Sequence, residues 1–325
     1  MNRLRYYKRI FSAYIFCRKN SNLTFWHTNL KINAPEKINR LAYYYLDYTV
    51  KADYPGPFDT NGVPMLNYFG DVGIQYNPDA IAQYALGNYE KYLTNNDSQY
   101  KEIFLKQADW FKNNLHERAN GIGVWEYNFD FEYFKPFKKP WHTSLAQGHG
   151  ISVLVRAYLL TKESAYLAAA DKAFLAFMYP TITDGGVKYI DQSKNVWFEE
   201  AIIDPPTHIL NGFIWALWGI NDYWLATQKP KARDCFNQGV ITLEKNLALY
   251  DCGFWSCYDL APTKIPNVAS WYYHQLHIAQ LQIMYYLTGN RFFSQFADKW
   301  RKYQASKLRR WSALGLKSIF KILYY

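Results

Sequence analysis

Apolar positions along this chain recur at helical spacing, in segments that come in pairs. The first member of each pair is apolar on nearly every side, whereas the second carries its charges on one face. A helix that is apolar all round is buried, and a helix with one apolar stripe lies at the surface. The apolar segments start near Ala82, Ala146, Leu210 and Ala279, and the charged segments cover 98–115, 162–179, 229–247 and 290–304.

The regular period of this repeat predicts the architecture. Each apolar segment has an amide side chain at its start, and these amides are 64, 64 and 69 residues apart: Gln83, Gln147, Asn211 and Gln280. A glycine turn with short β-like runs follows each of the first three pairs, at Gly121, Gly185 and Gly253. No polar capping repeat is evident, so a closed ring explains the pattern better than an open superhelix. We predict an α-dominated fold, an incomplete α/α toroid of about four helical hairpins, with short β-hairpins and the inner-helix starts at one rim.

Basic residues gather at the two ends of the chain, outside the repeat. Residues 1–40 hold nine Lys or Arg and one acidic residue, and residues 299–325 hold eight Lys or Arg and no acidic residue. Since the whole chain has a net charge of +10, the stretch between these ends is net negative. We predict a basic, aromatic lead-in over 1–52, a toroid over 53–304 and a basic amphipathic tail over 305–325. The ends either contact an anionic membrane surface, hold a polyanionic chain near the toroid, or are solvated.

Composition limits the class of protein. Half of the residues are apolar and 19% are aromatic, including 30 Tyr and 12 Trp, which suits a sugar-binding cleft or a protein interface. No apolar run approaches the roughly 20 residues of a membrane helix, and the short run at 10–17 lacks a signal-peptide cleavage site. Nucleic-acid binding is not expected, because no reader motif accompanies the charge. We predict a cytoplasmic protein, and the aromatic surface is compatible with a homodimer.

The side chains best suited to proton transfer lie between residues 258 and 277. Tyr258, Asp259, Tyr273, His274 and His277 flank a proline-containing loop that runs into an apolar helix. Tyrosine, histidine and carboxylate groups are the ones that move protons. From these residues alone, acid–base chemistry and simple packing explain the stretch equally well.

Several long runs of this chain resemble one enzyme family. They are WHTSLAQGHGISVLVRAYLLTKE, NVWFEEAIIDPPTHILNGF, LYDCGFWSCYDL and PNVASWYYHQLHIAQLQ. They resemble the C-terminal domain of D-glucuronyl C5-epimerases, and with residues 61–93 the resemblance covers roughly 55–303. Those enzymes convert D-glucuronate units of a heparan-type polymer into L-iduronate. The resemblance implies an α/α toroid, proton transfer without a cofactor or metal, and an anionic polysaccharide or lipid-linked glycan as substrate.

The resemblance also implies roles for particular residues. Its motifs place Tyr258 and Tyr273 near the reacting carbon, with Glu200 as a third candidate. Inverting a carbon next to a carboxylate requires a base on one face and an acid on the other. We predict that Glu200 and Tyr273 form this pair, with Tyr258 as a relay or an alternative proton donor.

Other residues are candidates for substrate binding. Of Glu199 and Glu200, only one can face a cleft if the two lie on a strand. Asn211 either donates to the substrate carboxylate or caps its helix, and His274 either orients a tyrosine or binds a hydroxyl. Gln147 is expected at the mouth with the other amides. Three tryptophans on the rim segments are expected either to stack on sugar rings or to pack: Trp125, Trp141 and Trp197.

Two departures from the family pattern bear on the substrate. The tyrosine that follows the Glu-Glu pair in the family is replaced by Ala201 here, and the arginine that follows Tyr-Asp-Leu is replaced by Ala261.

The sequence leaves three other functions open. A polysaccharide lyase shares the first proton abstraction, a glycan-binding protein would have lost activity, and a glycoside hydrolase would need two carboxylates about 5–10 Å apart, chosen from Glu126, Asp130, Glu200 and Asp259.

Overall fold

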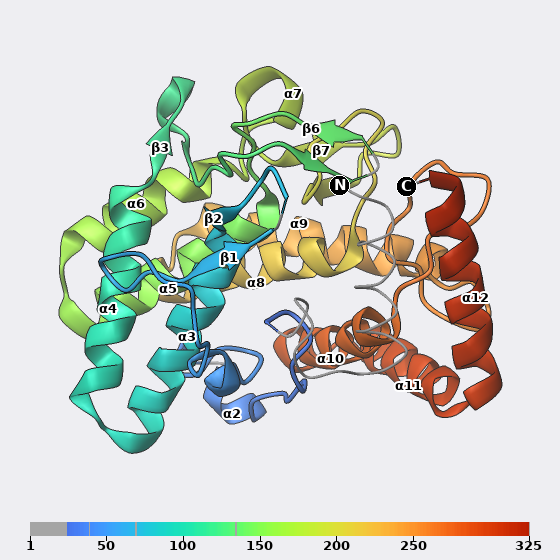
Figure 1. Ribbon diagram of the computed structural model, residues 1–325, viewed down its shortest axis with the longest axis horizontal. Helices are drawn as coiled ribbons and strands as arrows, with labels where there is room; N and C mark the ends of the chain where they lie inside the picture. The colour runs from blue at the N-terminus through green and yellow to red at the C-terminus, as the bar shows by residue number, and fades with distance from the viewer. Residues whose placement is uncertain (1–24, 39, 69, 134, 325) are drawn as a thin grey trace.

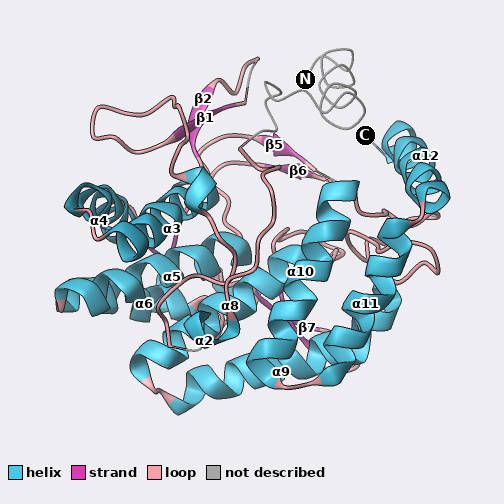
Figure 2. Cartoon of the chain, turned by 90° about the horizontal axis from the view of Figure 1, so that it is seen from below, coloured by secondary structure: helices cyan, strands magenta, loops and turns pink. Residues whose placement is uncertain are grey.

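The helices of the computed structural model form an α/α toroid, as the repeat predicts. The structure describes residues 25–38, 40–68, 70–133 and 135–324, and within them the chain makes four helical hairpins. Each inner helix packs against its outer partner, and successive inner helices pack against one another. Figures 1 and 2 show this arrangement. The inner helices are α3 (Pro78–Asn95), α5 (Ser144–Thr161), α8 (Leu210–Thr227) and α10 (Trp271–Thr288), and the outer ones are α4 (Ser98–Asn113), α6 (Ser164–Leu175), α9 (Pro230–Asn246) and α11 (Arg291–Ala305).

Local sequence sets where the inner helices begin. The side chains of Asn77, Thr143 and Ser270 accept hydrogen bonds from backbone N–H groups in the first turns of α3, α5 and α10. Such N-caps satisfy donors that a helix start leaves open. The caps therefore fix the residue at which each of these inner helices begins.

Two glycines allow α5 and α8 to approach closely. A Cβ atom on Gly148 would lie 2.6 Å from the backbone oxygen of Trp215, and a Cβ atom on Gly219 would clash with the backbone of Gly148. Only glycine leaves room for this backbone-to-backbone contact. The contact holds the centre of the inner layer together.

The predicted glycine turns are confirmed. Gly121, Gly185 and Gly253 have φ values of 74°, 75° and 85°, a region that favours glycine. Antiparallel strand pairs accompany the first two turns, namely β3 (His116–Glu117) with β4 (Gly123–Val124) and β7 (Lys188–Ile190) with β8 (Val196–Phe198). The third turn carries only an isolated bridge between Asp251 and Ser256. Two more strand pairs are β1 (Met65–Asn67) with β2 (Ile74–Tyr76) and β5 (Phe131–Glu132) with β6 (Pro136–Phe137).

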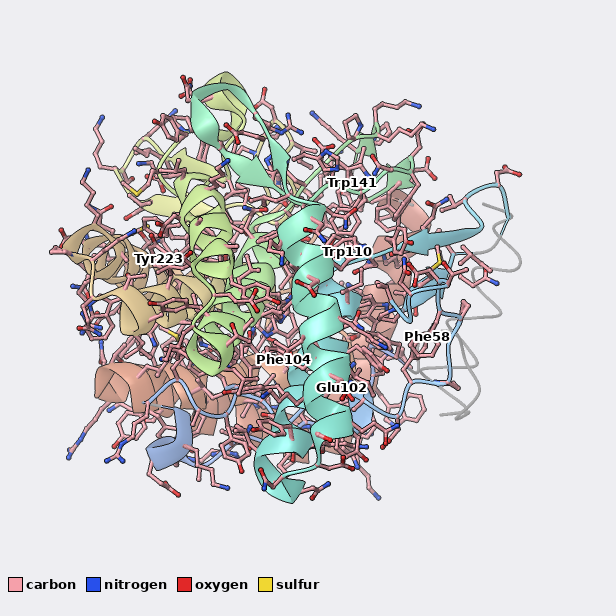
Figure 3. The ribbon with its side chains drawn as sticks, turned by 90° about the vertical axis from the view of Figure 1, so that its left-hand side faces the viewer. Phe58, Glu102, Phe104, Trp110, Trp141 and Tyr223 are labelled. Carbon is pink, nitrogen blue, oxygen red and sulfur yellow. The ribbon has the colours of Figure 1, made fainter. Side chains whose placement is uncertain are left out.

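Short helical segments and one long helix complete the described chain. The short ones are α2 (Pro35–Ile38), η2 (Thr49–Lys51), η3 (Ala119–Gly121), α7 (Thr181–Asp184) and η4 (Leu247–Tyr250). The basic tail forms a long helix, α12 (Lys307–Tyr324), which packs on α11 and is the red helix of Figure 1. In Figure 3, α4 crosses the outer face of the molecule, with Glu102 exposed and Phe104 buried.

The described part of the expected lead-in is built into the core. Tyr44 and Tyr45 are fully buried, and Tyr45 Oη donates to Asp222 Oδ1 at 2.7 Å. Arg156 Nη1 also contacts Asp222, at 2.6 Å from Oδ2, and neither charged side chain is exposed. Residues 25–52 therefore belong to the toroid physically, although they lie outside its helical repeat. The expectations for residues 1–24, including their basic charge and the run at 10–17, lie outside the described residues.

The structure bears on membrane attachment in one respect. Among the residues it describes, no helix combines the length and the apolar character that crossing a membrane requires. Cytoplasmic location, a homodimer and contact of the basic ends with a membrane surface stay predictions.

Candidate active site

A cleft of about 1070 Å³ opens where the inner helices begin. Its lining takes residues from the start of every inner helix, including Asn77, Thr143, Asn211 and Ser270. The loops after the three glycine turns, the helix α12 and four aromatic or apolar residues that precede α3 supply the rest, the last being Trp26, Leu46, Tyr48 and Tyr68. The sequence predicted this convergence, because a fixed period places equivalent parts of each hairpin at the same rim.

Glu200 lies in the loop after β8 and faces this cleft. Its Oε2 atom is 3.5 Å from the Nδ2 donor of Asn211, and its side chain packs against the Cα of Gly212. Burial is the main cause that raises the pKa of Glu200 to about 8, and the Asp79 carboxylate adds to it. A carboxylate in this environment is a stronger base than an ordinary glutamate.

Glu199 points to the other side of the chain. Its side chain is buried, and its Oε1 is 2.5 Å from Nδ1 of His208. Neither residue belongs to the lining of the cleft. Of the two adjacent glutamates, Glu200 is the one that lines the cleft, whereas Glu199, a predicted substrate-binding residue, does not.

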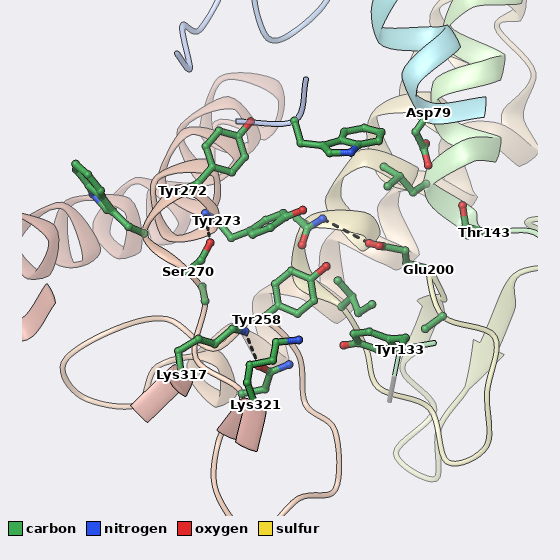
Figure 4. Close-up of a pocket in the computed structure, with 18 of the residues that line it drawn as sticks. Asp79, Tyr133, Thr143, Glu200, Tyr258, Ser270, Tyr272, Tyr273, Lys317 and Lys321 are labelled. Carbon is green, nitrogen blue, oxygen red and sulfur yellow. Dashed lines mark hydrogen bonds between the residues drawn. The ribbon is translucent and has the colours of Figure 1, made fainter. Parts of the chain in front are cut away.

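Tyr258 and Tyr273 lie next to each other in the cleft, across from Glu200 (Figure 4). Their ring centroids are 5.0 Å apart and their planes meet at 75°. Tyr273 stands in the first turn of α10, where the side chain of Ser270 caps its backbone N–H. Tyr258 is held by its backbone, which pairs with Asn267 and with Leu210. The structure therefore brings the three predicted acid–base residues into one cleft.

Asp259 anchors a polar network below the tyrosines. It is buried and accepts hydrogen bonds from the hydroxyl of Tyr133 and, at 2.5 Å, from Nδ2 of Asn267. Lys317 of α12 donates to Oδ1 of Asn267 at 2.7 Å. Asp259 is thus a structural support for this wall, and Asn267, Tyr133 and Lys317 are cleft residues that sequence reasoning missed.

Asp79 is another cleft residue that the sequence did not single out. It lies in the first turn of α3 and accepts hydrogen bonds from the hydroxyl of Tyr127 and from Nδ1 of His149, the latter at 3.1 Å. The sequence feature that could have identified Asp79 is its position directly after Asn77 and Pro78, which start the helix.

Lys317 and Lys321 of α12 could also have been identified from the sequence. They are four residues apart on an amphipathic helix and so lie on the same face.

Of the three predicted tryptophans, only Trp141 lines the cleft. It stacks on Tyr127 with a centroid distance of 4.0 Å and an interplanar angle of 6°. Trp125 is fully buried and donates to the backbone oxygen of Phe111 at 2.8 Å. Trp197 is buried against His208, with ring centroids 4.2 Å apart. Trp125 and Trp197 therefore pack in the core and are not placed to stack on a sugar in the cleft.

Gln147 and His274 also lie outside the lining of the cleft. Gln147 is buried and donates to the backbone oxygens of Gly123 and Ala173, at 2.9 and 3.1 Å. His274 lies 2.8 Å from Ser256 Oγ, and burial lowers its pKa to about 4. Both side chains hold turns of the rim in place, because buried polar groups need partners. The amides of the repeat therefore differ in role, since Gln83 and Asn211 do line the cleft.

The other carboxylates considered for a hydrolytic pair do not join Glu200 in the cleft lining. Glu126 pairs with Arg118 at 2.6 Å, and Asp130 pairs with Lys138 at 2.8 Å in an exposed position. Among the described residues, the acidic side chains in the lining are Asp79, Glu132 and Glu200. Ala201 lines the cleft as well, and its methyl group is buried in an apolar cluster with Phe137 and Ile209.

The fold and the cleft define an α/α-toroid protein whose pocket combines a half-buried carboxylate with a tyrosine pair. The family model of the D-glucuronyl C5-epimerase C-terminus matches residues 119–302. The chain belongs to this family.

Two curated relatives and one solved structure place the family match in context. A D-glucuronyl C5-epimerase of Caenorhabditis elegans is 32% identical over 230 residues, which make up 66% of this chain and 37% of that protein. An uncharacterised protein of Methanocaldococcus jannaschii is 30% identical over 270 residues, or 76% of this chain and 86% of that protein. A family 76 glycoside hydrolase (mannosidase) of Bacteroides thetaiotaomicron has a TM-score of 0.46 and 14% identity, covering 73% of this chain and 62% of that one. A likeness this distant carries no argument about chemistry.

Proposed function

We propose that this chain is an epimerase that inverts carbon 5 of D-glucuronate units in a polysaccharide and so produces L-iduronate. The observation that carries the proposal is the placement of Glu200 across one cleft from Tyr258 and Tyr273. Membership of the glucuronyl C5-epimerase family supports the substrate class. The chain spans 37% of the C. elegans relative, so that protein's activity is extended here as a proposal.

The reaction in this proposal consists of two proton transfers. The C5–H bond breaks as the Glu200 carboxylate takes the proton, and the electron pair spreads into the substrate carboxylate. The Tyr273 hydroxyl then donates its proton to the opposite face, which forms the new C5–H bond. Glu200 is left protonated and Tyr273 is left as a phenolate, and exchange with water, relayed by Tyr258, restores both groups. No atoms are gained or lost by the sugar.

The environment of Glu200 suits the role of a base. A base is most effective when its pKa lies near the working pH, and burial raises the pKa of Glu200 to about 8. Asn211 keeps the Glu200 carboxylate in place, and its own Oδ1 atom is buried with no hydrogen-bond partner among the described residues. Asn211 also lines the cleft beside Glu200, which supports it as a substrate-binding residue.

The direct test is solvent exchange at carbon 5. The protein is incubated in heavy water with a glucuronate polymer such as heparosan, deuterium at carbon 5 is followed by NMR, and ultraviolet absorbance is recorded for unsaturated chain ends. The proposal predicts deuterium and iduronate signals without a rise in absorbance. A rise in absorbance would identify a lyase, and the absence of both signals would refute the proposal. A Glu200→Gln variant serves as the matched control, because it removes the base and keeps the shape of the side chain.

A further inference from the structure

The positive charge of the cleft comes from one helix. Among the described residues, every basic side chain in the lining belongs to α12: Lys307, Arg310, Lys317 and Lys321. The acidic side chains of the lining, Asp79, Glu132 and Glu200, all come from other parts of the chain. Without α12, the described wall of the cleft would carry negative charge only and would repel an anionic polymer.

This helix lies beyond the part of the chain that the family model matches, which ends at residue 302. The family match therefore assigns nothing to these four basic residues. Their presence in the cleft is a property of this chain's own tertiary structure.

Figure 4 shows Lys317 and Lys321 beside Tyr258 in the cleft. Lys317 Nζ lies 5.3 Å from the centroid of the Tyr258 ring and binds Asn267. Lys321 follows one helical turn later and so lies on the same face of α12. Burial lowers the pKa of Lys317 to about 8 and that of Lys321 to about 6. The Asp259 carboxylate acts on both lysines in the opposite direction, and an additional anion bound in the cleft would further favour their charged forms.

We propose that α12 is the carboxylate-binding wall of the cleft, and that Lys317 and Lys321 hold the carboxylate of the uronate unit that lies beside Tyr258. This inference rests on the proposed function and names how the substrate is recognised. Ammonium donors placed there would also stabilise the negative charge that grows on the carboxylate as the C5 proton leaves.

The other two basic residues extend the wall along the helix. Arg310 precedes Lys317 by seven residues, which is about 10 Å along an α-helix. Its guanidinium lies 3.7 Å over the ring of Trp271, a side chain that is 42% exposed. A cation beside an exposed aromatic ring suits a neighbouring sugar of the same polymer. The wall is therefore expected to favour a polymer over a single glucuronate.

The test compares binding and turnover in charge variants of α12. Lys317→Met and Lys321→Met are made singly and together, and Lys302→Met, at an exposed position on α11, removes the same charge elsewhere. Heparosan binding is measured by titration calorimetry at two salt concentrations, and KM and kcat come from exchange at carbon 5. We expect the double variant to bind roughly tenfold to a hundredfold more weakly and with less salt dependence, while Lys302→Met binds as the native protein does. Carboxyl-reduced heparosan should bind the native protein weakly.

The outcomes separate this inference from the proposed function. Native affinity and KM in the double variant would overturn the carboxylate-binding wall, even if epimerisation is found. Heparosan binding that depends on both lysines, without any exchange at carbon 5, would support the wall and refute the epimerase. Failure of the native protein to bind any glucuronate polymer would overturn both. Lys317→Arg is the control for a folding defect in Lys317→Met. It keeps the charge at this position and should retain most of the binding.

Discussion

Replacing Gly212 with alanine tests whether the position of the Glu200 carboxylate controls activity. Gly212 lies in the first turn of α8, and the Glu200 side chain rests against it. A Cβ atom at this position would lie 2.7 Å from Cβ and 2.9 Å from Cδ of Glu200. Carbon atoms that are not bonded prefer about 3.5–4.0 Å, so the Glu200 side chain has to move by on the order of 1 Å. A displacement of that size costs about 100-fold in rate.

The same change has a small effect on folding. Alanine gains up to about 1 kcal/mol over glycine inside a helix, and overpacking costs about 1–3 kcal/mol. The free energy of unfolding should therefore fall by no more than about 3 kcal/mol. A carboxylate pushed towards water also loses the burial that raises its pKa to about 8. Since the ionised form is the base, the rise of kcat/KM with pH should move to lower pH in the variant.

The assay follows deuterium incorporation at carbon 5 between pH 5 and pH 10, with urea unfolding measured in parallel. Gly315→Ala is the matched control, because a Cβ atom there would meet nothing within 4 Å on an exposed part of α12. A folded Gly212→Ala protein with the native rate and the native pH profile would refute the role given to the Glu200 carboxylate.

Three further predictions concern the tyrosine pair, the burial of Glu200 and the ion pair of Arg156 with Asp222. Tyr273→Phe should lower exchange at carbon 5 by about 100-fold or more, and Tyr258→Phe should lower it less; full activity in Tyr273→Phe would exclude it as the acid. Because the folded pKa of Glu200 is about 8 and the ordinary value is 4.5, the native protein keeps a proton that the unfolded chain loses, so stability should fall as pH rises between these values. Glu200→Gln should reduce that fall by roughly 1–3 kcal/mol between pH 6 and pH 9 in urea unfolding, and an unchanged slope would contradict the burial. Asp222→Asn leaves the buried Arg156 charge without its partner, and should cost about 3–5 kcal/mol in the same assay; a loss below 1 kcal/mol would show that the pair contributes little.

Periodic features were predictable because they depend on local chemistry. The apolar positions of the inner segments recur at helical spacing over 18 residues in each inner helix, so both the hairpins and their order follow from the chain itself. The glycine turns were predictable for a similar reason, since Gly121, Gly185 and Gly253 adopt a backbone region that other residues avoid. The convergence of Glu200, Tyr258 and Tyr273 came from the equal period of the repeats together with the family motifs.

The sequence by itself thus determined the toroid, its rim and the three residues placed at the cleft. Only the tertiary structure decided which polar side chains face inward. Gln147 and His274 form hydrogen bonds with the backbone oxygens of Gly123 and Trp300, which no periodic pattern identifies as their partners. Trp125 is fully buried in the core. The folding of α12 beside the cleft likewise depends on contacts between segments distant in the chain, such as Lys317 with Asn267. Periodicity reports which face of a helix is apolar, whereas the partner of each polar atom is set by what the completed fold brings beside it.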